Sequence, residues 1–322
     1  MTHGSLFTGI GGFDLAADRV GIETLWQCDF DPKCRETLAA HWPNIERIHD
    51  VRKIGPATRP VDLVTGGFPC QDLSVAGRRA GLAGERSGLW HEYERILGLL
   101  KPRWVVVENV PGLLSSNRGR DFAVVLRGLV ELGYGVCWRI LDAQYFGLAQ
   151  RRKRVFIVGS LGDFSCSEVL FEPESVSGYS APGRKEGAEV AAVLDCGAKG
   201  RGFRTEPGEH IVAHTLSCPI SNARYDPNGE DYVISGLTTS LGHHGWSIGN
   251  EDFSKLRTDG VGVRRLTPTE CERLQGFPDG WTAMHKDTVR YRQLGNAVAV
   301  PVAEWILRRI AKKLLDSGVV EA

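Results

Sequence analysis

A cysteine and a glutamate that could act in one reaction each lie at or after the end of an apolar run of the chain. Cys70 lies in the turn GGFPCQDLS at residues 66–74, after the run VDLV, and Glu108 closes the run VVVEN before a Pro-Gly turn. The carboxyl ends of parallel strands in an α/β sheet share one edge, where ligands bind, so we expect the thiol and the carboxyl group to meet there. A nucleophilic thiol facing an acid indicates covalent catalysis.

The turn around Cys70 favours this interpretation over a structural one. An isolated cysteine is commonly a small buried apolar residue, and on its own Cys70 would be read so. Its neighbours Gly66, Gly67 and Pro69 instead control backbone geometry and allow a close approach to another group. A nearby positive charge or helix start would favour the attacking thiolate.

A glycine-rich turn, LFTGIGGFDLA, indicates a nucleotide site. It leads from a predicted strand through Gly9, Gly11 and Gly12 into a predicted helix, and Asp29 ends the next strand, where a carboxylate can bind ribose hydroxyls. Residues 13–15 lack the third glycine of the dinucleotide fingerprint, so a cofactor without phosphates is favoured, such as an adenosyl group bearing an amino acid. Glycine turns also occur in sheets that bind nothing.

A basic run precedes another predicted strand in QRRKRVFIVG. The side chains of Arg152 and Arg154 project to one face of an extended chain, whereas Arg151 and Lys153 project to the other. Two guanidinium groups can therefore share a pocket with the groups above. A solvated charge run is the ordinary alternative.

The elements that position these residues alternate in type. Apolar or β-branched runs predict strands at 5–7, 24–28, 61–66, 104–109 and 155–160. Helical periodicity occurs at 13–21, 31–42 and 89–100. This pattern predicts a mostly parallel α/β sheet with helices on both faces.

The rest of the chain predicts a second, smaller domain and a return to the first. Residues 163–262 are rich in Gly, Ser, Pro and Asn, which predicts a loop-rich β domain or an insertion. Thr267 opens a helix-start signature, and the amphipathic helix that stops at Gly318 presents apolar residues at 302, 303, 306, 307, 310 and 314. We predict a catalytic domain at 1–162, a small domain at 163–289 in which 263–289 packs as a hinge, and a completing segment at 290–322.

Composition sets the class of protein. The 322 residues include 39 basic and 39 acidic side chains, so a polyanion must be bound by local clusters rather than by net charge. The eight cysteines form no CxxC pair, which predicts no metal site, no disulfide framework and reduced thiols. No apolar run reaches the roughly 18 residues of a membrane helix, and no signal peptide is evident. We expect a cytoplasmic protein without a membrane partner.

Together these motifs resemble those of bacterial and phage DNA (cytosine-5) methyltransferases. The shared motifs, in the same order, are Gly9 to Phe13, Pro69-Cys70-Gln71, Glu108-Asn109-Val110, the Gln150, Arg152 and Arg154 spacing, RRLTPTECERLQGFPDGW and QLGNAVAVPV. The match covers residues 4–160 and 263–310. It implies a Rossmann-like sheet that uses S-adenosylmethionine, releases S-adenosylhomocysteine, and carries a target-recognition domain in the middle region.

The resemblance also implies catalytic roles. The Cys70 thiolate would add to carbon 6 of a flipped cytosine, so that carbon 5 can attack the methyl group. A protonated Glu108 would stabilise the charge developing at ring nitrogen 3. Arg154 would hold the base oxygen, with Arg152 and Gln150 supporting it.

Cofactor and DNA contacts are implied in the same way. The cofactor residues are Phe7, Gly9, Gly11, Phe13, Asp29, Phe30, Asp50, Val51, Leu89, Asn296 and Val298. Asp29 departs from the Glu that is usual in the family, which shortens its reach to ribose. The DNA-contacting residues are Gln71, Ser74, Arg78, Arg79, Arg86 and Thr215, and in the middle region Arg224, His243, His244 and Trp246 can read or fill the duplex. The partner is double-stranded DNA, bound by a monomer, with a cognate restriction enzyme in the same system.

Three other hypotheses remain open at this point. A dehydrogenase would explain the glycine turn and Asp29 but leaves Cys70, Glu108 and the arginines without a role. A DNA-binding module without catalysis predicts that Cys70→Ala changes no methylation. An RNA substrate is the third, since one related branch of the family modifies transfer RNA.

Overall fold

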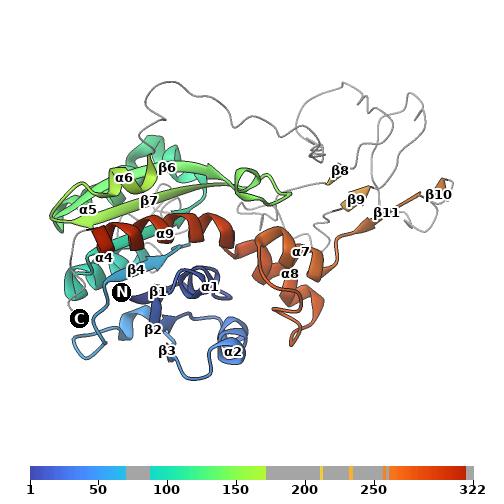
Figure 1. Ribbon diagram of the computed structural model, residues 1–322, viewed down its shortest axis with the longest axis horizontal. Helices are drawn as coiled ribbons and strands as arrows, with labels where there is room; N and C mark the ends of the chain where they lie inside the picture. Colours follow the sequence, from blue (N-terminus) through green and yellow to red (C-terminus); the bar gives the residue numbers. More distant parts are fainter. Residues whose placement is uncertain (70–87, 172–210, 213–231, 235–256, 259–260, 317–322) are drawn as a thin grey trace.

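A seven-stranded sheet forms the centre of the protein (Figure 1). The computed structural model describes residues 1–69, 88–171, 211–212, 232–234, 257–258 and 261–316. The strand order is β3-β2-β1-β4-β5-β7-β6, and β7 pairs antiparallel with both of its neighbours whereas the other pairings are parallel. The strands are β1 (Thr2–Leu6), β2 (Glu23–Cys28), β3 (Glu46–Ile48), β4 (Leu63–Gly66), β5 (Trp104–Asn109), β6 (Tyr134–Asp142) and β7 (Lys153–Leu161).

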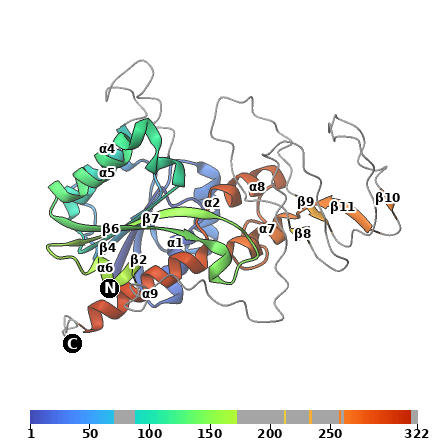
Figure 2. The ribbon, with the colours of Figure 1, turned by 90° about the horizontal axis from the view of Figure 1, so that it is seen from above.

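Helices cover both faces of this sheet, as the sequence predicts. Figure 2 shows α4 and α5 on one side of the strands and α1 and α9 on the other. The described helices are α1 (Gly12–Arg19), α2 (Pro32–His41), α4 (Gly88–Leu100), α5 (Arg120–Glu131), α6 (Cys166–Leu170), α7 (Pro268–Gln275), α8 (Asp287–Asn296) and α9 (Val300–Asp316). Every predicted strand and helix of the first 160 residues is present, while β3, α5 and β6 were not predicted.

Strand β5 is buried on both faces, which explains why its sequence is apolar without alternation. Trp104 and Val106 enter the core under α1, α6 and α9, whereas Val105 and Val107 enter the core under α4 and α5. Each of these four side chains is at most 1% exposed. A strand buried on both faces reads as a continuous hydrophobic run.

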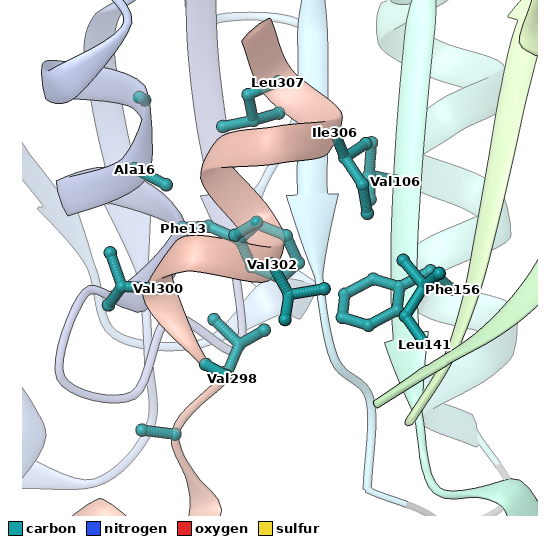
Figure 3. Packing of buried hydrophobic residues seen from close by; sticks show 14 of the residues in the cluster. Phe13, Ala16, Val106, Leu141, Phe156, Val298, Val300, Val302, Ile306 and Leu307 are labelled. Carbon is teal, nitrogen blue, oxygen red and sulfur yellow. The ribbon is translucent and has the colours of Figure 1, made fainter. Parts of the chain in front are cut away.

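Helix α9 packs on the sheet through its predicted apolar face (Figure 3). Val302, Ala303, Ile306, Leu307 and Ile310 are all buried, and residue 314 lies outside the described side chains. In Figure 3, Ile306 lies beside Val106 of β5. The carboxyl-terminal helix therefore completes the core of the first 160 residues.

Helix α7 begins at the predicted signature. Thr267 accepts a hydrogen bond from the Glu270 amide, and Glu270 accepts one from the Thr267 amide, which is a capping box. Leu266, Cys271 and Phe277 are buried in the same core as α9. The segment after residue 265 thus packs against the main sheet.

A second sheet precedes this segment. Its order is β10-β11-β9-β8, all antiparallel, from β8 (Ile211–Val212), β9 (Tyr232–Ile234), β10 (Arg257–Thr258) and β11 (Val261–Arg265). These strands fall inside the region predicted as a β domain, and the domain boundaries stay a prediction. In the described part of the chain no helix is long and apolar enough to span a bilayer. The same residues contain no cluster of three or more side chains suited to a metal ion.

Shortening Ile306 to alanine tests the packing of α9. Ile306 is 0% exposed, so Ile306→Ala should lower the free energy of unfolding by about 2–5 kcal/mol through lost burial and a residual cavity. Ile140→Ala is the control, because the same atoms are removed from a side chain that is 45% exposed. Urea denaturation followed by circular dichroism measures both, and equal losses would contradict this account.

Candidate active site

A cavity of about 730 Å³ opens at the carboxyl ends of the parallel strands. Phe7 follows β1, Asp29 follows β2, Asp50 lies just beyond β3, and Gly67 follows β4, and all four line the cavity. Its volume lies within the roughly 300–1,000 Å³ typical of small-molecule sites. The topology therefore collects residues from separate parts of the chain around one space, as expected for an open α/β sheet.

An ion pair between Glu108 and Arg154 forms one wall of this cavity. The Arg154 Nε atom lies 3.0 Å from Glu108 Oε1, and the two side chains are 12% and 13% exposed. Glu108 is at the end of β5, while Arg154 is near the start of β7, and these ends coincide because β7 runs antiparallel to β5. A carboxyl group and a guanidinium group thus face the same cavity.

The turn that leads to Cys70 is fixed to β5. The Asn109 side chain donates a hydrogen bond of 3.0 Å to the Phe68 carbonyl. Gly67 lies so close to Glu108 that a Cβ atom there would be 2.9 Å from Glu108 Oε2. Pro69, the residue before Cys70, lines the cavity. Cys70 itself lies outside the described residues.

Arg152 anchors the segment that comes after α8. Its Nη2 atom donates to the carbonyls of Gly295, at 3.0 Å, and Ala297, at 2.8 Å. The intervening residue, Asn296, lines the cavity. The pKa of Arg152 is lowered to about 9, mainly by burial and also by the neighbouring charge of Arg154, against the opposing effect of Glu108. Arg152 therefore positions Asn296.

The glycine turn contributes Phe7 and Gly9 to the lining of the cavity. Phe7, Gly9 and Gly11 all have positive φ, of 51°, 60° and 83°, and glycine adopts this geometry without strain. Gly11 also packs so tightly under Trp42 that a Cβ atom would be 2.4 Å from the indole ring. The requirement for glycine at residue 11 thus has two separate causes.

Asp29 holds this turn in place. Its carboxylate accepts hydrogen bonds from the amides of Gly9, at 2.7 Å, and Asp31, at 2.8 Å. Burial raises the pKa of Asp29 to about 6, against the opposing effect of these two hydrogen bonds. Next to it, the Phe30 ring is 76% exposed at the cavity wall, where a flat apolar ligand can stack on it.

Comparison with known proteins identifies the family. The family model described as C-5 cytosine-specific DNA methylase matches residues 1–312. The chain belongs to this family. It is a DNA cytosine-5 methyltransferase, which sets aside the dehydrogenase and the non-catalytic hypotheses.

Individual relatives align with most of the length of this methyltransferase. Type II methyltransferase M.Bsp6I of Bacillus sp. (strain RFL6) is 30% identical, over 97% of this chain and 98% of that protein. DNA N-6-adenine-methyltransferase of Escherichia phage P1 is 29% identical over 97% of this chain, which spans 61% of that longer protein. The solved structure of the Entamoeba histolytica methyltransferase EhMeth has a TM-score of 0.65, with 18% identity and 98% of each chain covered. That structure shares the fold.

Most of the described residues that the sequence nominated come together in the cavity. Those lining it are Phe7, Gly9, Asp29, Phe30, Asp50, Val51, Leu89, Glu108, Arg152, Arg154 and Asn296. Gly11, Phe13 and Val298 instead support its wall from behind, since Phe13 and Val298 are only 7% and 8% exposed in the core. Gln150 is 4% exposed beside Arg151 and is not part of the lining. Gln71, Ser74, Arg78, Arg79, Arg86 and Thr215 lie outside the described residues, as do Arg224, His243, His244 and Trp246.

Sequence reasoning missed several lining residues. Among the described residues these include Asp31, Cys34, Arg292 and Gln293. Arg292 pairs with Asp31 at 2.9 Å, which joins α8 to the start of α2 across the cavity rim. Gln293 is 3% exposed, and its position in the motif RYRQLGNAV, one helical turn before Asn296, was the available signal.

Adding a methyl group at Gly67 should disturb the Glu108 carboxyl group. The Cβ atom of Gly67→Ala would meet Glu108 Oε2 at 2.9 Å, so the carboxyl group must move. We expect DNA methylation to slow by about 10- to 100-fold, since a displacement of about 1 Å has effects of this size in active sites.

Gly112→Ala is the matched control for this substitution. Its nearest neighbour would be Val110 Cγ2 at 3.9 Å, an ordinary contact. Both variants are assayed by incorporation of labelled methyl groups into duplex DNA. Normal rates for Gly67→Ala would contradict the close approach to Glu108.

Proposed function

We propose that this methyltransferase transfers a methyl group from S-adenosylmethionine to carbon 5 of a cytosine flipped out of a specific duplex sequence, through a covalent adduct with Cys70. The observation that carries the proposal is the shared cavity. Glu108 and Arg154 line it with Pro69, which immediately precedes Cys70 in the chain. A base inside a duplex is out of reach of any enzyme pocket, so the target must leave the stack at a cost of a few kcal/mol.

The proposed reaction divides one difficult step into easier ones. The Cys70 thiolate forms a bond to carbon 6, and the displaced electron pair reaches ring nitrogen 3, which takes a proton from Glu108. Carbon 5 of the resulting enamine would then attack the methyl group, whose bond to the sulfonium sulfur breaks. A base would take the carbon 5 proton, and the electrons of that C–H bond would re-form the double bond between carbons 5 and 6 and expel the sulfur as thiolate. Ring nitrogen 3 would return its proton to Glu108. Each residue thus acts on a different atom of one ring.

The arginines divide two further tasks in this proposal. Arg154, which pairs with the ionised form of Glu108 in the structure, would hold the exocyclic oxygen of the base when Glu108 carries the proton that it gives to ring nitrogen 3. Arg152 acts at a distance from the base, because its guanidinium group binds the carbonyls on either side of Asn296. Gln150, buried just before these arginines, would support the same turn.

The cavity fits an adenosyl cofactor that lacks phosphates. The exposed Phe30 ring offers a stacking face for adenine, and the Asp29 carboxylate suits ribose hydroxyls. Asp50, Val51 and Leu89 would form the adenine edge, while Phe7, Gly9 and Asn296 would surround the amino-acid end. The bound sulfonium group would supply the methyl group, and S-adenosylhomocysteine would leave.

DNA would be bound by the segment that follows Cys70 in the chain and by the middle region. We assign Gln71, Ser74, Arg78, Arg79 and Arg86 to contacts with the duplex next to Cys70, and Thr215 to the target-recognition region. Local positive charge is needed because the whole chain has no net charge. We further propose a monomer that acts in the cytoplasm of a bacterial or phage-infected cell beside a cognate restriction enzyme, since a relative over nearly its full length is a Type II methyltransferase.

Replacing Cys70 tests the catalytic assignment. DNA from cells expressing the protein should contain 5-methylcytosine in one sequence context by bisulfite sequencing, and Cys70→Ala should reduce it by at least about 1,000-fold, as expected when a covalent nucleophile is removed. Cys137→Ala is the control, because Cys137 lies outside the cavity lining. Full activity of Cys70→Ala would refute the covalent mechanism.

The same preparations identify the product and the substrate. Nucleoside mass spectrometry separates 5-methylcytosine from N6-methyladenine, the product named for the phage P1 relative. Parallel assays on duplex DNA and transfer RNA should give activity on DNA alone. With 5-fluorocytosine in the target, fluorine cannot leave carbon 5, so a protein–DNA adduct that survives denaturing electrophoresis should accumulate only when Cys70 is present.

Cofactor affinity should depend on the ionisation of Asp29. Because the pKa of Asp29 is raised to about 6, the carboxylate is ionised at pH 7 and becomes protonated as the pH falls to 5. A protonated group accepts ribose hydrogen bonds poorly, so we expect the affinity for S-adenosylhomocysteine to fall about tenfold over this range. Isothermal titration calorimetry measures it.

Two variants isolate this effect. Asp29→Asn should bind weakly and with a much flatter pH profile between pH 5 and 7. Asp14 also titrates there, since burial raises its pKa to about 7, and its contribution remains in Asp29→Asn. Asp50→Asn should keep the wild-type profile, because the ordinary pKa of an aspartate lies below this range and a hydrogen bond from Arg52 lowers the pKa of Asp50 further. An unchanged slope in Asp29→Asn would exclude Asp29 as the titrating group.

A further inference from the structure

We infer that Trp281 is a positioning residue for the cofactor-binding turn, which it holds by a hydrogen bond from its indole N–H to the Ile10 carbonyl. The distance is 2.9 Å and the contact is buried. Ile10 stands between Gly9 and Gly11, whose positive φ values define the turn. The inference rests on the proposed use of S-adenosylmethionine by this cavity.

The indole ring is fixed from several sides. It stacks on His41 with ring centroids 3.5 Å apart and an interplanar angle of 4°. Trp42 meets it edge-on at 5.5 Å, and Phe277 lies at 5.4 Å. The His41 ring also bonds to the Trp281 carbonyl at 2.7 Å. The side chain is 7% exposed, so its N–H group has a single orientation toward Ile10.

A buried carboxylate fixes the backbone on both sides of Trp281. Glu272, which is 0% exposed on α7, accepts hydrogen bonds from the amides of Gly280, at 2.7 Å, and Thr282, at 2.8 Å. Arg290 of α8 neutralises it at 3.1 Å and also bonds to the Thr282 hydroxyl at 3.0 Å. We call this arrangement of Glu272, Arg290 and the Gly280 and Thr282 amides the Glu272 clamp. It satisfies the buried charge and fixes the backbone position from which the Trp281 indole reaches the turn.

The hydrogen bond from Trp281 adds to the other contacts that hold the turn, because it fixes the carbonyl of the residue at its centre. Gly9 is held from below by Asp29, and a Cβ atom on Gly9 would touch nothing within 4 Å. Ile10 carries the carbonyl that Trp281 fixes, and Gly11 contacts Trp42, the edge-on partner of the same indole. Losing the N–H donor should let the turn sample other conformations, which weakens cofactor binding without removing any group from the reacting atoms.

The location of Trp281 makes this contact more than core packing. Helix α7 comes directly after β11, the strand that leads out of the second sheet. Strand β11, the Glu272 clamp, Trp281 and Ile10 therefore form a covalent and hydrogen-bonded path from the second sheet to the cofactor turn. A displacement of α7 on DNA binding would act on the turn through this indole, as well as through Phe277, which lies next to Gly12.

Trp281→Phe removes the N–H donor and keeps an aromatic ring for stacking. We expect the dissociation constant for S-adenosylhomocysteine and the KM for S-adenosylmethionine to rise about 2- to 10-fold, the range for one lost hydrogen bond. We expect kcat at saturating cofactor to change less than about twofold, since no group at the reacting atoms is lost. Calorimetry and steady-state methylation kinetics measure these quantities.

Trp26→Phe is the matched control. The buried Trp26 indole donates a hydrogen bond of the same kind, 3.0 Å long, to the Arg59 carbonyl, away from the cavity lining. It should lose stability without losing cofactor affinity. Equal affinity in Trp281→Phe and the unaltered protein, or equal weakening in both variants, would overturn the inference. Failure of the unaltered protein to bind the cofactor would instead overturn the proposed function and the inference with it.

Glu272→Gln provides a second, independent variant. It keeps the shape of the side chain and removes its charge, so the Gly280 to Thr282 backbone should loosen and cofactor affinity should fall in the same direction. The double variant with Trp281→Phe should be no weaker than the more affected single variant, because both act through one contact. Additive losses would show that Glu272 and Trp281 act separately and would overturn the clamp.

Discussion

The burial of β5 on both faces is the constraint on which the arrangement of the active site depends. Alternate side chains from Trp104 to Val107 enter two separate cores, so no polar residue is tolerated until the strand ends. Glu108 is the first residue of the strand that is only partly buried, and Asn109, which is buried, is satisfied by its hydrogen bond to the Phe68 carbonyl. Because parallel strands end at the same edge, the carboxyl group arrives beside the turn from β4, and both line one cavity with residues of the glycine turn from β1.

The reversed direction of β7 adds a second kind of residue to that edge. Each parallel strand brings the residues at its carboxyl end to the cavity, whereas β7 brings those at its amino end, so the arginines at 152 and 154 reach the same space from the start of a strand. One of them pairs with Glu108 and the other holds the backbone around Asn296. Two side chains separated by a single residue therefore serve different walls of one cavity.

Much of this arrangement can be predicted from local pattern alone. Apolar runs predicted the strands because burial on both faces leaves a continuous signature, and the alternation of Arg152 and Arg154 with exposed neighbours predicted their common face. Strands β3 and β6 were missed, the first because it has three residues and the second because Gly135 and Arg139 interrupt its apolar pattern. The hydrogen bond between Trp281 and Ile10 joins residues 271 positions apart, and no local signal encodes such a contact. For the same reason, the sequence could not predict that Phe13 and Val298 lie in the core behind the cavity and not in its lining.

The described residues just before and just after the middle region, near 168–171 and at 266, contact the same helix or the core beneath it. On one side, Arg309 of α9 binds the carbonyls of Glu168, Val169 and Phe171 and stacks on Trp305. On the other, Leu266 is 2% exposed in the core beneath that helix. The core around the main sheet therefore need not change when the length of the chain between these two attachment points changes. Such a layout allows the segment between these two attachment points to vary in length or sequence while the core on which both are packed stays the same.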